Sequence, residues 1–487
     1  RKYEFVISEI IAAPDGYSRA IYAINGQYPG PPIVVNKGDK AIIQVTNELP
    51  VPTSLHVHGM FQRGTPWHDG VTGGTQCPIP VYETFTYEID TSEQFGTTWY
   101  HSHTSSQYAD GILGPFIIQS PDDPNKDLYD EELLVVLTDW YHAPAHKLLK
   151  IYLTPESNGN SPTPDSALIN GKNRFNCFAL QAEGTFHFVP GRRYRIRIIN
   201  ASNDSAFTFS IDGHRLTVIE ADMTPMRPYT VDRISVHVAQ RYSVIVEANA
   251  AVDNYWMRAE LSDKCMFVHN NLLDRMVLAE VRYKGSRKGE PTSEPVDQVK
   301  ETQCVDLDYR HLSPVEPQKA EPATKQYTMN FYFNPDENGM KRGYVNNSTY
   351  IIEPYNPILN DIFFGQRDFP DSANVIFLEK DEVIELVLNN FWGREHPFHL
   401  HGHDFQVLSW NTSSQYDPVR SPEIYSMENP LRRDTSTIPA RGYSVIRFRS
   451  NNPGLWAFHC HIDWHMEDGL LVNFVEQPDA VEMMRAP

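Results

Sequence analysis

Histidines spaced two residues apart are the strongest chemical signal in this sequence. The 487-residue chain has 19 histidines, and chance placement would give about 0.7 His-x-His pairs. Five are present, at 56/58, 101/103, 399/401, 401/403 and 459/461. Residues i and i+2 of a β-strand point to the same face, so each pair would direct two imidazoles to one place. Imidazole binds copper, zinc, iron and nickel, so the pairs predict a metal centre without naming the metal.

The segment HCHIDWH at 459–465 narrows the choice of metal. One thiolate, two imidazoles and a weak axial neighbour form the blue-copper electron-transfer site, and Cys460, His465 and His396 supply this set. The axial candidate is Leu470, which cannot ligate, whereas a structural zinc ion would require a fourth strong ligand. The segment therefore predicts a type 1 copper with a moderately high reduction potential.

Four segments, in the same order, resemble the copper-binding motifs of the multicopper oxidases, the laccase and ferroxidase family. They read HVHG, WYHSH, HPFHLHGH and HCHIDWHMEDGL. Flanking stretches such as TDWYH and VAQRYSVIVEAN are more similar to fungal members than to plant or bacterial ones. Others, including YADGILGPFII, are similar to the fungal iron-oxidising branch. The resemblance covers nearly the whole chain.

The resemblance implies four copper ions and assigns their ligands. The type 1 copper would be held by His396, Cys460 and His465, with Leu470 beside it. His403 would not be a ligand. The remaining three ions would form a trinuclear cluster: the type 2 copper on His56 and His399, one type 3 copper on His58, His101 and His461, and the other on His103, His401 and His459.

The position of Cys460 between His459 and His461 explains the expected reaction. Reduction of O2 to water takes four electrons, whereas typical donors give one each, so an electron acceptor separate from the O2 cluster allows electrons to be stored. The thiolate then has a short covalent path to both type 3 ions. Asp69 and Asp463 match acidic positions of the family, and carboxylates beside metal-bound histidines orient the rings and relay protons.

The reducing substrate has two candidates. Iron-oxidising relatives use acidic residues around the type 1 copper, but the matching positions here are Asp212, Asn334 and Trp392, so two of the three carboxylates that Fe2+ would need are missing. Asp232 matches the pocket carboxylate of fungal laccases, although a strand-end Asp is an equal interpretation, and Trp392 would add an aromatic wall near the exposed edge of His465. We therefore predict a laccase-like oxidase of phenols and aromatic amines, with ferroxidase as the alternative. A blue-copper electron carrier would have no use for the eight additional histidines.

The elements that position these residues recur three times. Strand-like stretches with alternating apolar and polar residues, each with an Asn at or near its end, lie at 41–49, 193–200 and 382–390. A Trp-containing segment follows each of them, at 96–103, 253–260 and 454–465, and the middle copy lacks histidines. The repeats predict an all-β fold of three consecutive β-sandwich domains, which the resemblance makes cupredoxin-like with Greek-key topology.

The expected domains are residues 1–125, 126–300 and 301–487. The first carries ligands of the trinuclear cluster, and the third carries the type 1 site and the other cluster ligands. The second would bind no copper and would form a wall of the substrate pocket. A polar stretch at 121–130 and a Pro-, Glu- and Lys-rich stretch at 284–326 separate the domains.

Composition and charge limit the partners. The formal net charge of −20 disfavours nucleic acid and anionic membranes. No apolar run is long enough to span a bilayer, and the chain lacks an apolar signal core at its start. Asn-x-Ser/Thr sequons suit a secreted, N-glycosylated protein whose signal peptide has been removed; they lie at Asn200, Asn203, Asn346, Asn347 and Asn411. We expect a monomer that acts on O2 and small aromatic reductants.

Five cysteines are too sparse to stabilise so long a chain, so a large β core must do so. We expect a disulfide between Cys265 and Cys304. The partners of Cys77 and Cys177 are not assigned.

Overall fold

The structure, a computed structural model, describes residues 1–487 except 174–183, 263–264, 266–272, 274, 296–303 and 485–487. Within this part of the chain the strands form six sheets, in three consecutive pairs. Each pair is a β-sandwich, so the predicted all-β fold of three cupredoxin-like domains is confirmed. The strands of the three pairs lie at 2–119, 131–283 and 325–476. The domain boundaries at 125 and 300 stay predictions.

The first sandwich consists of two four-stranded sheets, with strand orders β2-β1-β4-β6 and β3-β8-β7-β5. Its apolar interior is a separate core cluster that includes Phe5, Ile43, Val57 and Phe116. The strands are β1 (Lys2–Ala12), β2 (Arg19–Ile24), β3 (Ile33–Asn36), β4 (Lys40–Asn47), β5 (His56–Val57), β6 (Thr84–Asp90), β7 (Gly96–His101) and β8 (Leu113–Gln119).

The second sandwich consists of a six-stranded sheet, β10-β9-β12-β17-β14-β15, and a five-stranded sheet, β11-β19-β18-β13-β16. The strands are β9 (Glu131–Trp140), β10 (Ser166–Ile169), β11 (Thr185–Phe188), β12 (Arg193–Asn200), β13 (Phe207–Ile211), β14 (Leu216–Ala221), β15 (Thr224–Val231), β16 (Ile234–Val236), β17 (Arg241–Glu247), β18 (Asn254–Leu261) and β19 (Met276–Tyr283).

The third sandwich has the same layout, with sheets β21-β20-β23-β28-β25-β26 and β22-β30-β29-β24-β27. Its core is continuous with that of the second sandwich. The strands are β20 (Lys325–Pro335), β21 (Lys341–Val345), β22 (Val375–Leu378), β23 (Val383–Asn390), β24 (His396–Leu400), β25 (Phe405–Asn411), β26 (Leu431–Arg433), β27 (Thr435–Ile438), β28 (Tyr443–Arg449), β29 (Gly454–Cys460) and β30 (Leu471–Glu476).

The three repeated stretches occupy equivalent places. They form β4, β12 and β23, each of which pairs in parallel with the first strand of its domain and antiparallel with a later one. The structure shows why each strand ends in Asn: the side-chain amide donates hydrogen bonds to main-chain carbonyls beyond the strand. These residues are Asn47, Asn200 and Asn390. The recurring Asn is therefore buried, and its hydrogen bonds hold the following backbone segments in place.

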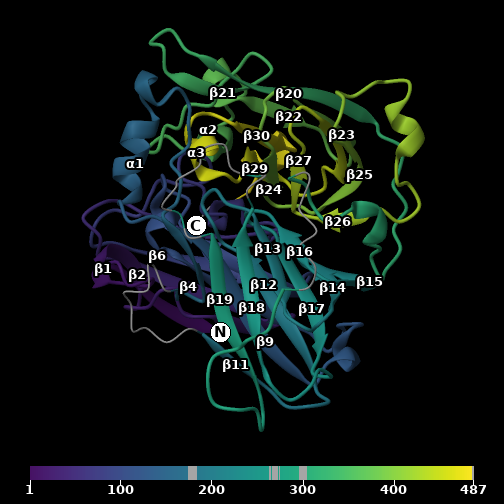
Figure 1. The fold of residues 1–487 in the computed structure, drawn as a ribbon. Helices are drawn as coiled ribbons and strands as arrows, with labels where there is room; N and C mark the ends of the chain where they lie inside the picture. Colours follow the sequence, from purple (N-terminus) through teal and green to yellow (C-terminus); the bar gives the residue numbers. More distant parts are fainter. Residues whose placement is uncertain (174–183, 263–264, 266–272, 274, 296–303, 485–487) are drawn as a thin grey trace.

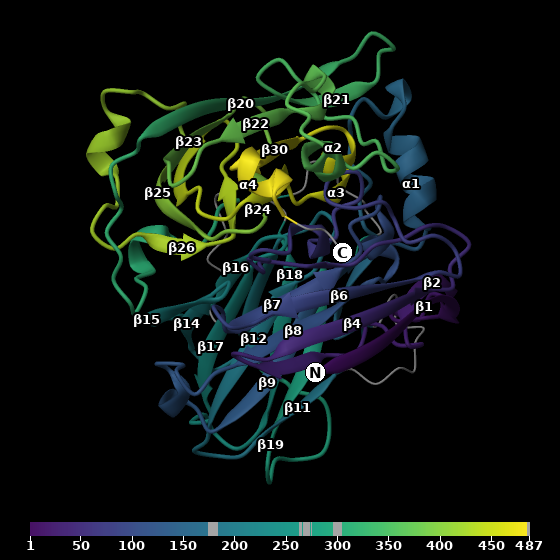
Figure 2. The same ribbon diagram turned by 180° about the vertical axis from the view of Figure 1, so that it is seen from behind.

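The third sandwich, green to yellow in Figure 1, lies across the ends of the purple first sandwich and the teal second one. The view from behind shows the first-domain strands β1, β4 and β6 below β24 and β30 of the third domain (Figure 2). The described residues form four short α-helices, of which α3 follows β29 closely and is buried. The helices are α1 (Ala145–Tyr152), α2 (Ile358–Phe363), α3 (Asp463–Glu467) and α4 (Pro478–Glu482). No helix in the described ranges combines the length and the apolar character needed to cross a membrane.

The disulfide between Cys265 and Cys304 is confirmed, with Cα atoms 5.2 Å apart. Cys77 is exposed and unpaired, and Cys177 lies outside the described residues. The prediction of glycosylation is wrong for two of the sequons, because Asn200 and Asn203 are buried. The monomeric state stays a prediction.

Candidate metal centre and substrate pocket

Three side chains of the third domain form a compact nitrogen and sulfur site. Nδ1 of His396 lies 3.2 Å from Nδ1 of His465, and Sγ of Cys460 lies 3.5 and 3.6 Å from these two atoms. The centre of such a triangle is about 2 Å from each corner, which is a bonding distance for nitrogen and sulfur ligands of a transition metal. His396 begins β24, Cys460 ends β29 and His465 lies on α3, so two neighbouring strands and one turn of helix create the site.

The surroundings of this triangle are apolar. Leu470 is fully buried, and its main chain receives a hydrogen bond from the Cys460 N–H and donates one to the His465 carbonyl. The Phe333 ring lies 5.6 Å from the His396 ring and 5.1 Å from the His465 ring. Burial raises the pKa of the Cys460 thiol well above its ordinary value, so a bound cation is needed to hold the thiolate form. The three donors fit a type 1 copper, with no donor atom at Leu470.

Eight further imidazoles converge at the contact between the first and third domains. Two strand registers set up the cluster: His56 lies opposite His101 on β5 and β7, and His399 lies opposite His459 on β24 and β29. Across the cluster, Nε2 of His401 lies 3.0 Å from Nε2 of His459. Several sets of three have ring nitrogens within 4.8 Å of one another, including His103, His401 and His459. The eight residues are His56, His58, His101, His103, His399, His401, His459 and His461.

Most imidazoles of this cluster are oriented by a protein hydrogen bond on one side and face the cluster on the other. For example, Nδ1 of His56, His101 and His399 bonds a main-chain carbonyl, while Nε2 of the same rings is buried with no partner among the described residues. Both nitrogens of His461 are buried in the same way. Burial and neighbouring imidazoles hold the pKa of most of these rings well below the ordinary value. Neutral, oriented imidazoles with orphaned inward nitrogens are what a metal cluster requires.

The two carboxylates that the sequence predicted near the cluster, Asp69 and Asp463, both border it. Oδ2 of Asp69 lies 2.9 Å from Nδ1 of His401, and Oδ1 lies 3.3 Å from Nδ1 of His56. Burial alone would raise the pKa of Asp69, but the two imidazoles lower it overall. Asp463 lines a small space together with His101, His459 and His461, and burial raises its pKa well above the ordinary range. Asp69 thus orients two rings, and Asp463 lies beside the cluster.

A cavity of about 260 Å³ opens beside the type 1 site. His465 reaches it with Nε2, which lies 3.4 Å from the Ser161 hydroxyl. The second domain supplies one wall, including Ser161 and Asp204, and the third supplies Lys341, Trp392 and Arg394. The expectation that the second domain borders the pocket, and that Trp392 does, agrees with this geometry.

Known proteins are similar to the whole chain. Sequence profiles described as multicopper oxidase match residues 7–123, 131–286 and 332–480. Laccase-2 of Botryotinia fuckeliana is 37% identical over 99% of this chain and 83% of its own length, and Laccase-1 of Agaricus bisporus is 38% identical over 98% and 90%. The chain belongs to the multicopper oxidase family.

Solved structures of multicopper oxidases agree with this. The laccase from Botrytis aclada superposes with a TM-score of 0.91 at 36% identity, covering 99% of this chain and 88% of that one. Fet3p, described as a multicopper oxidase that functions in iron import, superposes with a TM-score of 0.90 at 32% identity, covering 100% and 92%. The predicted enzyme class, a copper-dependent oxidase, is confirmed, and the laccase interpretation is stronger than the ferroxidase one.

One sequence-based assignment for this multicopper oxidase is wrong. Asp232 does not border the pocket at His465: it follows β15 at the edge of the second-domain sheet, and its exposed carboxylate pairs with Arg215. The pocket carboxylate is Asp204 instead. Asp212, which was compared with an iron-binding position, is buried and pairs with Arg258 at 2.8 Å.

Sequence reasoning also missed the residues that hold the cluster between domains. Both carboxylate oxygens of Asp434 accept hydrogen bonds from the Arg241 guanidinium, at 2.7 and 2.5 Å, and Oδ1 lies 3.1 Å from Nε2 of His58. Its main-chain carbonyl lies 2.9 Å from Nδ1 of His399. Asp434 therefore joins all three domains of the oxidase at the cluster. The only signal in the sequence is the RRDT stretch, which says nothing of a partner 193 residues away. His403, as expected, points away from the cluster toward Glu476.

Proposed function

We propose that this multicopper oxidase is of the laccase type. It takes single electrons from phenols and aromatic amines at the His465 edge of the type 1 site, and it reduces O2 to water at the cluster of eight imidazoles. The observation that carries the substrate assignment is the cavity beside His465, which has an aromatic wall and lacks a free carboxylate cluster.

Four copper ions would occupy the two sites, one on His396, Cys460 and His465 and three among the eight imidazoles. The bound ions supply the one-electron redox couples of the reaction. The chain supplies the path between them, because Cys460 is covalently joined to His459 and His461, which face the cluster. It also supplies rigidity, since six of the eight cluster imidazoles are oriented by a main-chain carbonyl or a carboxylate.

The substrate side is arranged for a planar ring. Trp392 presents an aromatic surface in the cavity, and its ring lies 5.3 Å from that of Phe333, which packs on both type 1 histidines. A ring stacked on Trp392 would bring its hydroxyl or amino group toward Nε2 of His465. The Ser161 hydroxyl next to that nitrogen would hydrogen-bond the same group.

Iron is the weaker candidate substrate. Fe2+ requires several anionic oxygen ligands, and the lining of the cavity offers one carboxylate, Asp204, which is already paired with Arg394 at 2.8 Å. The printed role of Fet3p in iron import belongs to that protein. An electron carrier is excluded on different grounds, because a carrier has no use for a second site of eight imidazoles.

Asp69 and Asp463 would serve the oxygen reaction, which consumes four protons for each O2. Asp69 fixes His401 and His56, and Asp463 stands at the cluster beside His461.

We also propose a secreted protein, glycosylated at Asn346, Asn347 or Asn411; the first two are exposed. Treatment with an N-glycosidase would then lower the mass of the protein made in a eukaryotic host.

The decisive experiment measures kcat/KM under air for an aminophenol, a methoxyphenol and Fe2+, with copper content and O2 uptake determined on the same sample. Four copper ions per chain and a preference for the organic donors would support the proposal. A preference for Fe2+ by orders of magnitude would overturn the substrate assignment, and oxidation without O2 uptake would overturn the oxidase assignment.

A further inference from the structure

The cavity beside His465 holds fixed charges that neither copper site uses. Its charged lining residues are Asp204, Lys341 and Arg394. The protein as a whole is acidic, with a formal net charge of −20, so cationic groups gathered at this opening are against the general trend of the molecule. Their arrangement decides what kind of reductant the cavity receives.

The one carboxylate of the lining, Asp204, is paired through one of its two oxygens. Nη2 of Arg394 donates to Oδ2 of Asp204 at 2.8 Å and to its main-chain carbonyl at 3.2 Å, and both side chains are 4% exposed. The Asp139 carboxylate fixes the loop that carries Asp204 by accepting three main-chain N–H bonds from residues 203–205. Glu395 lies 3.7 Å from Nε of Arg394 but is not part of the lining. Arg394 therefore balances the charge of Asp204 and the loop is fixed, so the pair adds no net negative charge to the cavity, although Oδ1 of Asp204 has no partner among the described residues.

Lys341, in contrast to Asp204, has no side chain of opposite charge paired with it in the described part of the chain. Its ammonium lies 4.6 Å from the centre of the Trp392 ring and donates to the Asn158 carbonyl at 3.2 Å. No carboxylate lies within ion-pair distance of it in the described ranges of the chain. Lys341 begins β21 and is partly exposed, so an uncompensated positive charge stands at the aromatic wall of the cavity.

We propose that the cavity selects aromatic reductants that carry an anionic substituent, a carboxylate or a sulfonate, on the ring. The ring stacks on Trp392, its oxidisable group faces His465 and its anion is attracted by Lys341. This inference rests on the proposed laccase-type function and specifies its substrate class. The same charge disfavours cationic donors, including Fe2+. An attraction at a partly exposed site amounts to roughly a tenfold preference.

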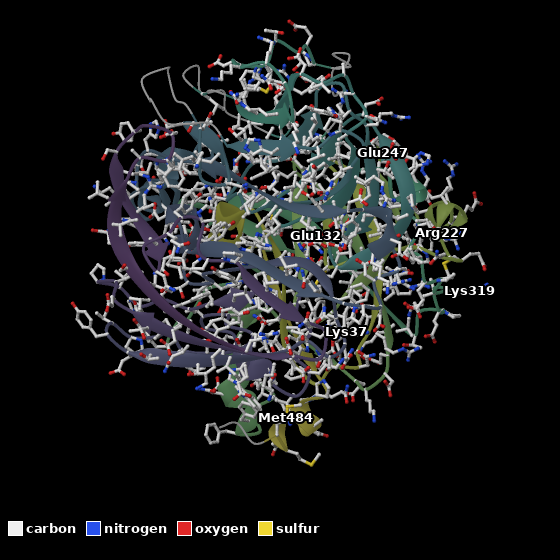
Figure 3. All side chains as sticks on the ribbon, turned by 90° about the horizontal axis from the view of Figure 1, so that it is seen from below. Lys37, Glu132, Arg227, Glu247, Lys319 and Met484 are labelled. Carbon is white, nitrogen blue, oxygen red and sulfur yellow. A yellow bond between two sulfur atoms is a disulfide. The ribbon has the colours of Figure 1, made fainter. Side chains whose placement is uncertain are left out.

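The test compares a methoxylated 4-hydroxybenzoate with its methyl ester, which keeps the phenol but removes the charge. The two differ in redox driving force, so the quantity to follow is the ratio of their kcat/KM values across variants. Lys341→Met is expected to lower the acid-to-ester ratio about tenfold, chiefly through KM, and Lys341→Glu to lower it further. Lys319→Met is the matched control, because Lys319 is an exposed lysine of the same domain at the rim of the molecule (Figure 3), 67% exposed and paired with Glu428.

A second readout does not depend on turnover. 4-Methoxybenzoate has the ring and the anion but no phenolic O–H, and 4-methoxybenzamide is its neutral counterpart. Titration calorimetry should show that Lys341→Met weakens binding of the benzoate about tenfold relative to the benzamide, and that Lys319→Met changes neither. An unchanged benzoate-to-benzamide ratio together with an unchanged acid-to-ester ratio would overturn the charge inference. If the methyl ester itself supports no O2 uptake in the copper-loaded wild-type protein, the proposed function fails instead.

Discussion

The residues of one candidate copper site come from a single domain, whereas those of the other come from two domains. The triangle of His396, Cys460 and His465 is built within one domain by adjacent strands and a short helix. The eight-imidazole cluster needs residues of the first and third domains. Asp434 of the third domain contacts His58 of the first and forms a buried ion pair with Arg241 of the second. The first site is therefore a property of local strand pairing, whereas the second depends on domain docking.

Removing the thiolate should separate the two sites most sharply. Cys460→Ser takes away the soft ligand of the triangle and the covalent electron path, so we expect kcat for phenols to fall roughly 10³-fold or more. The cluster keeps all its imidazoles. Copper content should fall by one ion per chain, with loss of the intense thiolate-to-copper absorption. Loss of the cluster copper as well would show that the sites are not independent.

Domain docking is tested by Asp434→Asn. It removes the nearer of the two carboxylates beside the fully buried guanidinium of Arg241 and leaves Asp222 at 3.5 Å, so the cost in stability is at most the about 3–5 kcal/mol of a broken buried pair. Thermal unfolding and copper retention at the cluster should both suffer, and the triangle should be less affected. Asp232→Asn is the matched control, since its pair with Arg215 is exposed and contributes little. Equal effects of the two substitutions would contradict the role of Asp434.

The orientation of single rings is tested by Asp69→Asn. The amide loses the charge that holds His401 and His56, so copper affinity of the cluster should fall about 10–100-fold, while the triangle is unchanged. Dialysis against a graded chelator series, with separate detection of the two sites, measures this. A uniform loss of copper from both sites would count against a local role.

The smallest effect is expected at the pocket. Trp392→Asp adds an oxygen ligand near His465 and removes the aromatic wall, so kcat/KM for Fe2+ should rise severalfold and that for a methoxyphenol should fall by a similar factor. Both rates are measured as O2 uptake. No gain with Fe2+ would remove the argument that missing carboxylates exclude iron.

The sequence alone predicted the fold and the metal-binding side chains because both depend on short-range periodicity. Alternation marks strands, and His-x-His on a strand directs two rings to one face. The repeated Asn-terminated strands indicated three sandwiches, which the structure has. The side chains of the outer two copies, including Cys460 and its flanking histidines, converge as those motifs required.

Only the tertiary structure decided which charges meet. Arg394 with Asp204 and Arg241 with Asp434 pair across domains and about 190 residues apart, and no spacing rule links such positions. The same limit explains the error at Asp232, which was matched to the pocket carboxylate of fungal laccases but follows β15 at a sheet edge. Local pattern fixes which face a side chain takes, whereas domain docking fixes what that face meets.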